Sequence, residues 1–284
     1  MVKLIYGLAK FSNQKYGFGS RPKVLNKKKI LSNVKRNFNI FECADRYNKS
    51  IDYVALLKEK NIHFKIDKIP VKKNEKNIEN YFKNKIKLYK NVHDSKQIKV
   101  LYLHENALKI ISNKRVLKVL EKLKKNKIVK NFGVSIYSEK ELKFAIQNNL
   151  YNYIQMPLNL ADSYFFFKYK KQLYKKKIIA RSLALQGTLL NSITNIKFKN
   201  KIDQYIKKID SICSKHNITR EELVYRFVFS LNKLDYAIIG SINQTNIKNI
   251  IKFKKKHRLN NRIMKELINL SKQKKKWVNP QNWV

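Results

Sequence analysis

Short apolar runs in this chain repeatedly end on side chains that can hold or transfer protons. In KVLYLHENALKII (residues 99–111), the apolar run 100–103 stops at His104, one of only five histidines. Imidazole, carboxylate, phenol and ammonium groups gathered in one pocket could carry out acid–base chemistry. The residues that stand at or just beyond the ends of such runs are Glu42, Tyr47, Lys68, His104, Ser135, Gln155, Asn159, Arg181, Ser182, Gly240 and Ser241.

The elements that must position these residues alternate between apolar runs and helical-period segments. The runs cover residues 3–9, 38–44, 62–68, 98–104, 128–135, 151–157, 177–183 and 236–241, and amphipathic segments include 74–90, 113–126 and 138–148. Near-continuous apolar strands are typical of a parallel sheet buried on both faces. Thr219 and Glu222 predict a capping box that opens a further helix.

Eight strand–helix repeats in 284 residues predict an α/β fold, a (β/α)8 TIM barrel. An open doubly wound sheet is the alternative, but the first turn lacks a G-x-G-x-x-G pattern and offers only Gly7. We expect one domain over residues 1–284, with a C-terminal helix and tail at about 259–284. In a barrel, the strand ends named above would meet at the carboxyl rim, where such folds carry their active sites.

Composition indicates a globular protein, because 43% of the residues are hydrophobic and 12% are aromatic. The start of the chain does not resemble a signal peptide, and no apolar stretch approaches the roughly 18 residues of a membrane span. Cys43 and Cys213 lie far apart and lack metal-site spacing. We therefore expect a cytoplasmic protein that binds no metal and no membrane.

The net charge of +45 raises the possibility of a nucleic-acid partner. However, 55 lysines and only 9 arginines carry the positive charge, whereas base and phosphate readout favours arginine. Lysine runs such as residues 83–90 and 254–257 fall on the polar sides of helical patterns. The sequence favours solvated helix faces over a specific nucleic-acid surface.

The strand-end motifs together resemble the aldo-keto reductase family, in its short bacterial type. The similarity runs in register from residue 3 to about 250. The motifs, in the family's order, are KLIYGLAKFSNQKYG, FECADRY, IDKIP, LYLHE, FGVSIY, YIQMPLN, IIARSLALQG and AIIGS. Each motif alone is weak, but eight in order at plausible spacing are specific. The resemblance implies a TIM barrel that reduces carbonyl groups with a nicotinamide cofactor.

The resemblance also implies a catalytic tetrad of Glu42, Tyr47, Lys68 and His104. In this scheme Tyr47 donates the proton, the Lys68 ammonium stabilises its phenolate, and His104 hydrogen-bonds the substrate carbonyl. The family's acid is normally aspartate, and Glu42 is longer by one methylene, about 1.5 Å. We expect Glu42 still to pair with Lys68.

Cofactor contacts are implied in the same way. Ser135, Gln155 and Asn159 resemble nicotinamide-side contacts, and Arg181 occupies a stacking position. Ser182, Gly240 and Ser241 would meet the phosphates, with Asn246 at the adenosine end. The resemblance favours NADPH, but residues 240–249 contain no arginine to clamp a 2′-phosphate, so NADH is the alternative.

The sequence thus predicts an NAD(P)H-dependent oxidoreductase that reduces an aldehyde or ketone to an alcohol. Its partner would be a small-molecule carbonyl substrate, and we expect a monomer or weak oligomer. The alternative, suggested by Glu42, is a catalytically impaired protein of the same fold that serves as a binding or regulatory subunit.

Overall fold

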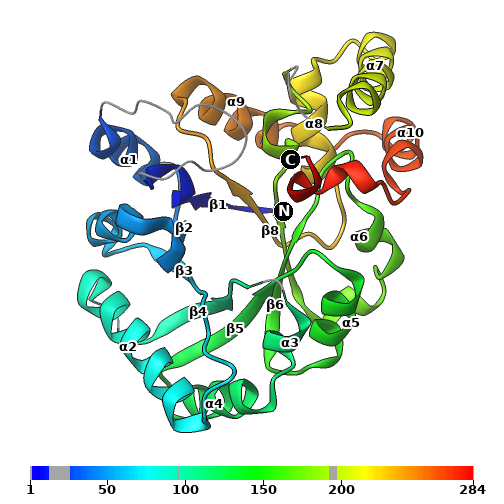
Figure 1. The fold of residues 1–284 in the computed structure, drawn as a ribbon. Helices are drawn as coiled ribbons and strands as arrows, with labels where there is room; N and C mark the ends of the chain where they lie inside the picture. Colours follow the sequence, from blue (N-terminus) through cyan, green and yellow to red (C-terminus); the bar gives the residue numbers. More distant parts are fainter. Residues whose placement is uncertain (1, 13–25, 95, 106, 192–196, 284) are drawn as a thin grey trace.

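Eight parallel strands form a closed barrel in the computed structural model, which describes residues 2–12, 26–94, 96–105, 107–191 and 197–283. Each strand pairs with the next in the chain, and the last pairs with the first (Figure 1). This confirms the predicted TIM barrel, and each predicted apolar run coincides with one strand, the third of which begins one residue before its run, at Asn61. The strands are β1 (Lys3–Gly7), β2 (Ile40–Ala44), β3 (Asn61–Ile66), β4 (Ile98–Leu103), β5 (Val129–Ser135), β6 (Tyr151–Pro157), β7 (Lys177–Arg181) and β8 (Tyr236–Ile239).

Helices surround the barrel (Figure 1). In the described residues they are α1 (Lys27–Lys35), α2 (Glu75–His93), α3 (Leu108–Ile111), α4 (Lys114–Lys125), α5 (Glu139–Gln147), α6 (Tyr164–Lys168), α7 (Lys199–Lys215), α8 (Arg220–Phe229), α9 (Gln244–Lys255) and α10 (Asn261–Ser271). The predicted amphipathic segments correspond to α2, α4 and α5. Asn74, Asn113 and Ser138 cap their first turns.

The predicted capping box at the start of α8 is only half formed. The Thr219 hydroxyl accepts a hydrogen bond from the Glu222 backbone N–H at 3.3 Å. The Glu222 carboxylate does not return to Thr219, because it pairs with Arg226 and Lys256, both at 2.7 Å. Two cations therefore outcompete the backbone N–H for this carboxylate.

Side-chain alternation along the strands divides the core into two shells. Phe41, Cys43 and Phe64 point outward and pack beneath the helices. Ile5, Val100 and Ile179 point inward and fill the barrel. Register partners on parallel strands point to the same face. A residue can therefore reach the barrel interior only if it occupies an inward position in the alternation along its strand.

Aromatic rings fill much of that interior, and we call His63, Tyr102, Tyr153 and Tyr236 the interior ring cluster. His63 Nδ1 lies 3.0 Å from the Tyr102 hydroxyl, and its ring contacts those of Tyr153 and Tyr236. Burial lowers the pKa of His63 to about 3, so the imidazole is neutral at physiological pH. Gly133 on β5 provides the space for the Tyr102 ring, because a Cβ built there lies 2.5 Å from that ring.

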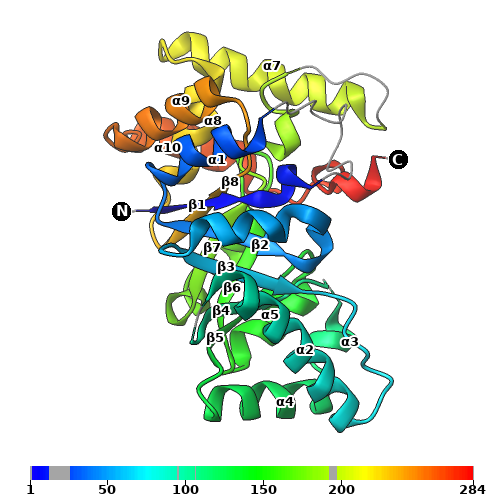
Figure 2. The ribbon, with the colours of Figure 1, turned by 90° about the vertical axis from the view of Figure 1, so that its left-hand side faces the viewer.

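The carboxyl ends of the strands define one end of the molecule. Figure 2 shows β1 starting at the end marked N, with the short turns Lys276–Val278 and Pro280–Asn282 at the opposite end. The site described below lies at this second end. None of the described helices is both long and apolar enough to traverse a lipid bilayer.

Gly133→Ala should destabilise the barrel by about 1–3 kcal/mol, because the new methyl group overlaps the Tyr102 ring and approaches Tyr153 Cβ at 2.9 Å. Urea denaturation measures the change. Gly240→Ala is the matched control, since a Cβ at Gly240 has no described atom within 4 Å. Equal stability of the two variants would contradict this account of the interior.

Candidate active site

Glu42 and Tyr47 are brought together where β2 ends. The strand stops at Ala44 and passes directly into a 3-10 helix, Asp45–Leu57, whose first turn carries Tyr47. The Tyr47 hydroxyl donates a hydrogen bond to Glu42 Oε1 at 3.3 Å. Both residues are buried, with 4% and 3% of their surfaces exposed. A phenol and a carboxylate therefore share one enclosed site.

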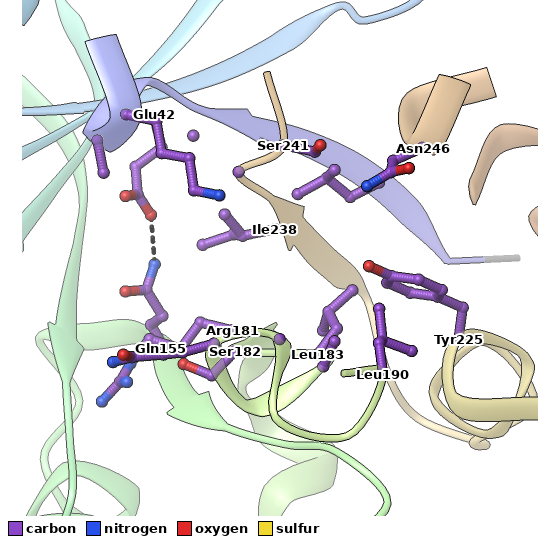
Figure 3. Close-up of a pocket in the computed structure, with 18 of the residues that line it drawn as sticks. Glu42, Gln155, Arg181, Ser182, Leu183, Leu190, Tyr225, Ile238, Ser241 and Asn246 are labelled. Atoms are coloured by element: carbon purple, nitrogen blue, oxygen red, sulfur yellow. Dashed lines mark hydrogen bonds between the residues drawn. The ribbon is translucent and has the colours of Figure 1, made fainter. Parts of the chain in front are cut away.

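Lys65 on β3 completes a buried ion pair with Glu42. Its Nζ lies 2.9 Å from Glu42 Oε1 and donates to Gln155 Oε1 at 2.6 Å. Gln155 Nε2 in turn donates to Glu42 Oε2 at 2.7 Å, the dashed line in Figure 3. Burial lowers the pKa of Lys65, and the attraction of Glu42 opposes this effect. Lys65, Glu42 and Gln155, from three strands, thus form a closed triangle of contacts.

The prediction that Lys68 pairs with Glu42 is wrong. Lys65 faces the barrel interior beside its register partner Ala44. Lys68 lies three residues further on, past the end of β3, in a left-handed conformation with φ 56° and with its side chain exposed. Inward positions recur at every second residue, so a shift of three changes the face even before the strand ends. Asp67, two residues after Lys65, is buried and pairs with Arg46.

His104 stands beside Tyr47, just beyond β4. Its backbone N–H donates to the Ile66 carbonyl at 2.8 Å, and the two rings meet edge to face with centroids 5.7 Å apart. Burial and the nearby Lys65 charge lower the pKa of His104 well below its usual range, so the ring is neutral. Its buried Nδ1 has no hydrogen-bond partner among the described residues. A neutral imidazole can donate one hydrogen bond, and in this form it can orient a carbonyl oxygen.

A cavity of about 380 Å³ opens beside these groups and runs across the ends of β7 and β8. Figure 3 shows Glu42 and Gln155 at one end, with Tyr225 and Asn246 at the other. It contains most of the residues predicted for cofactor binding. Those that line it are Gln155, Arg181, Ser182, Gly240, Ser241 and Asn246.

Two predicted cofactor residues, Ser135 and Asn159, do not line this cavity. Ser135 is buried with 3% exposed, and Asn159 is fully buried. The Asn159 amide donates to the Ser182 carbonyl at 3.0 Å, and its Oδ1 accepts from the backbone of Ala161 and Asp162. Asn159 therefore holds the backbone of Ser182 in place.

Arg181 adds positive charge to the cavity beside Gln155 (Figure 3). The Arg181 guanidinium lies 3.9 Å above the Tyr137 ring and donates through Nη2 to the Ile136 carbonyl at 3.1 Å. Its buried Nε has no hydrogen-bond partner in the described chain. Lys10 also lines the cavity, and burial lowers its pKa. These groups suit an anionic ligand.

Sequence reasoning missed Lys10, Lys65 and Tyr137. The inward direction of Lys65 was predictable, because His63, Lys65 and Asp67 are alternate residues and therefore face the same side of the strand. Tyr137 follows the apolar end of β5, and the sequence carries no signal that its ring would support Arg181. No group of three or more metal-ligating side chains occurs among the described residues.

Comparison with known proteins identifies the class. The sequence model of the aldo/keto reductase family matches residues 3–271, so the chain belongs to this family. Membership implies NAD(P)H-dependent reduction of carbonyl groups. The search of curated proteins returned no matching sequence.

Solved structures share the fold. The aldo-keto reductase AKR11C1 from Bacillus halodurans (holo form) superposes with a TM-score of 0.76 at 13% identity, covering 97% of this chain and 94% of its own. The glycerol dehydrogenase AKR11B4 from Gluconobacter oxydans gives 0.68 at 14% identity, covering 94% and 90%. At such identities the similarity establishes the barrel, and residue roles must be argued from the site itself.

Lys65→Met should destabilise the protein by about 3–5 kcal/mol, because the buried Glu42 carboxylate loses its cation. Lys68→Met is the matched control and should change stability by less than about 0.5 kcal/mol, since that side chain is exposed. Urea denaturation at neutral pH compares the two variants. A larger loss from Lys68→Met than from Lys65→Met would restore Lys68 as the partner of Glu42.

Proposed function

We propose that this protein reduces an aldehyde or ketone to an alcohol with NAD(P)H, using Tyr47 as the proton donor. The observation that carries the proposal is the buried Glu42–Lys65 pair, with the Tyr47 hydroxyl 3.3 Å from the same carboxylate at the edge of the cavity. Family membership supplies the reaction class, and the site supplies the residues.

The cavity has features that a nicotinamide dinucleotide requires. Its volume falls within the usual range for ligand pockets, about 300–1,000 Å³. Arg181 and Lys10 would face the pyrophosphate, and Ser182, Gly240 and Ser241 would offer hydroxyl and backbone donors. When bound, the nicotinamide supplies the hydride.

The protein's own residues would supply the proton. As hydride reaches the carbonyl carbon, charge develops on the oxygen, and the Tyr47 O–H bond breaks to form the alcohol O–H. The buried Lys65 ammonium stabilises the phenolate left behind. Neutral His104 would fix the angle of the carbonyl by a hydrogen bond to its oxygen, which contributes to orientation. Tyr47 then regains its proton from solvent.

Glu42 also supports the alternative function, a barrel that binds ligands but reduces carbonyls poorly. Its Oε1 contacts both the Tyr47 hydroxyl and Lys65 Nζ, so a negative charge lies next to the phenol. A carboxylate that accepts this hydrogen bond favours the neutral phenol over the phenolate. The carboxylate of Glu42, brought close to the phenol by its extra methylene, thus opposes the stabilisation of the Tyr47 phenolate by Lys65.

Cytoplasmic location, a single domain and a monomeric or weakly oligomeric state are parts of the same proposal. Cys43 and Cys213 are both free and buried, which suits a reducing compartment.

Tyr47→Phe should lower kcat by at least about a hundredfold, because the ring stays while the only transferable proton is removed. Cofactor affinity should change less than about threefold, since the phosphates of the cofactor would bind to Arg181 and Lys10 and not to the Tyr47 hydroxyl. Steady-state kinetics with an aldehyde panel, together with cofactor titration, measures both quantities. A variant that retains most of its kcat would remove Tyr47 from the mechanism.

Substitutions of Glu42 distinguish the enzyme from the impaired alternative. If Glu42 mainly holds Lys65, Glu42→Asp should keep turnover within about tenfold, or about 1.4 kcal/mol of barrier. Glu42→Ala should cost far more, because Lys65 loses its anchor. If the protein has lost catalysis, the native form should be nearly inactive, and Glu42→Asp should raise turnover by withdrawing the carboxylate from Tyr47. We expect the first pattern.

A further inference from the structure

We propose that this protein binds NADH in preference to NADPH, with Asn246 and Glu221 at the adenosine end as the residues that determine this. The inference rests on the proposed function, which fixes the direction of the cofactor. Hydride must leave from beside Tyr47 and Lys65, so the adenosine ribose must lie at the other end of the cavity. We call Leu190, Tyr225 and Asn246 the far end (Figure 3).

Positive charge is unevenly distributed along the described lining. Its cations are Lys10, Lys65 and Arg181. Lys65 pairs with Glu42, and Lys10 follows Ala9, which packs with Tyr47. The charge of Arg181 acts on both Lys65 and His104. Lys65 and Arg181 therefore lie toward the catalytic end, Lys10 follows a residue that packs there, and no described cation is among the residues of the far end.

The nearest cations beyond the lining are not placed to bind a 2′-phosphate. Arg220 donates through Nε and Nη2 to Asp210, both at 2.6 Å, and through Nη1 to the Leu190 carbonyl at 3.2 Å. Its guanidinium is thus already occupied on the side of the far end. Lys248 lies two residues after Asn246 on α9, which places it about 200° around the helix and on the opposite face.

A carboxylate adds negative charge to this end. Glu221 on α8 accepts a hydrogen bond from Asn249 Nδ2 at 3.3 Å. Its charge also reaches Tyr225, where, after burial, it contributes to raising the pKa of the phenol. Glu221 forms no ion pair with the described residues. A carboxylate repels a phosphate but accepts hydrogen bonds from ribose hydroxyls, so the far end suits the unphosphorylated ribose.

Calorimetric titration of the full-length protein with NAD⁺ and with NADP⁺ tests the inference, since these ligands differ only by the 2′-phosphate. The salt concentration should be about 0.3 M, because a net charge of +45 attracts the more anionic nucleotide non-specifically. NAD⁺ should bind at least tenfold more tightly. Equal or tighter binding of NADP⁺ would overturn the inference alone, whereas binding of neither nucleotide would overturn the proposed function with it.

Substitutions on α9 test which residue determines the preference between NAD⁺ and NADP⁺. Asn246→Arg should improve NADP⁺ binding relative to NAD⁺ by at least tenfold, because it adds the missing clamp. Lys248→Asn is its control on the same helix and should leave the ratio of the two affinities within twofold. A loss of NADP⁺ affinity in Lys248→Asn would show that Lys248 reaches the phosphate and would overturn the inference.

Glu221→Gln should improve the relative affinity for NADP⁺ at least threefold by removing the repulsive charge. Glu266→Gln is the matched control, since this acid lies on α10, paired with Lys215 at 2.8 Å. An unchanged ratio in Glu221→Gln, or an equal shift in both variants, would mean that Glu221 does not act on the ribose site.

Discussion

The buried ion pair between Glu42 and Lys65 is the interaction on which the site depends. Removing two charges from water costs several kcal/mol per ion, and their attraction repays this only if the remaining hydrogen bonds are satisfied. Gln155 satisfies them, since it accepts from the ammonium and donates to the second carboxylate oxygen. Glu42 and Lys65 come from the neighbouring strands β2 and β3, whereas Gln155 comes from β6, so the triangle is complete only when the barrel brings these strands together. Fold and chemistry are coupled at this point.

Burial, together with nearby cations, keeps the neighbouring histidine neutral. Lys65, Arg46 and Arg181 all lower the pKa of His104 in addition to the effect of burial. Because the imidazole is neutral, it can orient a carbonyl without adding a further cation to an enclosed site that already holds several. In the proposed reaction the proton would come from the Tyr47 phenol, whose hydroxyl contacts the carboxylate that pairs with Lys65.

The sequence predicted the barrel well because apolar runs and capping residues act locally. Eight runs gave eight strands, and Glu42, Tyr47, Gln155 and Arg181 were located at the rim from strand ends alone. The prediction that Lys68 pairs with Glu42 was wrong because a sequence motif does not show which side chains point into the barrel and which point outward. Asn159 does not line the cavity, because its side chain bonds the backbone of its own loop and the carbonyl of Ser182. Ring contacts such as Arg181 on Tyr137 are equally non-local.

Strand geometry also limits how such a site can change during evolution. Inward positions on β3 are separated by two residues, or about 6.6 Å along the strand. A lysine can therefore migrate only in steps of that size, whereas adding a methylene to an acid extends its reach by about 1.5 Å. Glu42 is level with His63, one inward position below Lys65. If the acid or the lysine moved to another strand position during evolution, the side chain of its partner would have to change in length. In related barrels the two positions should therefore change together.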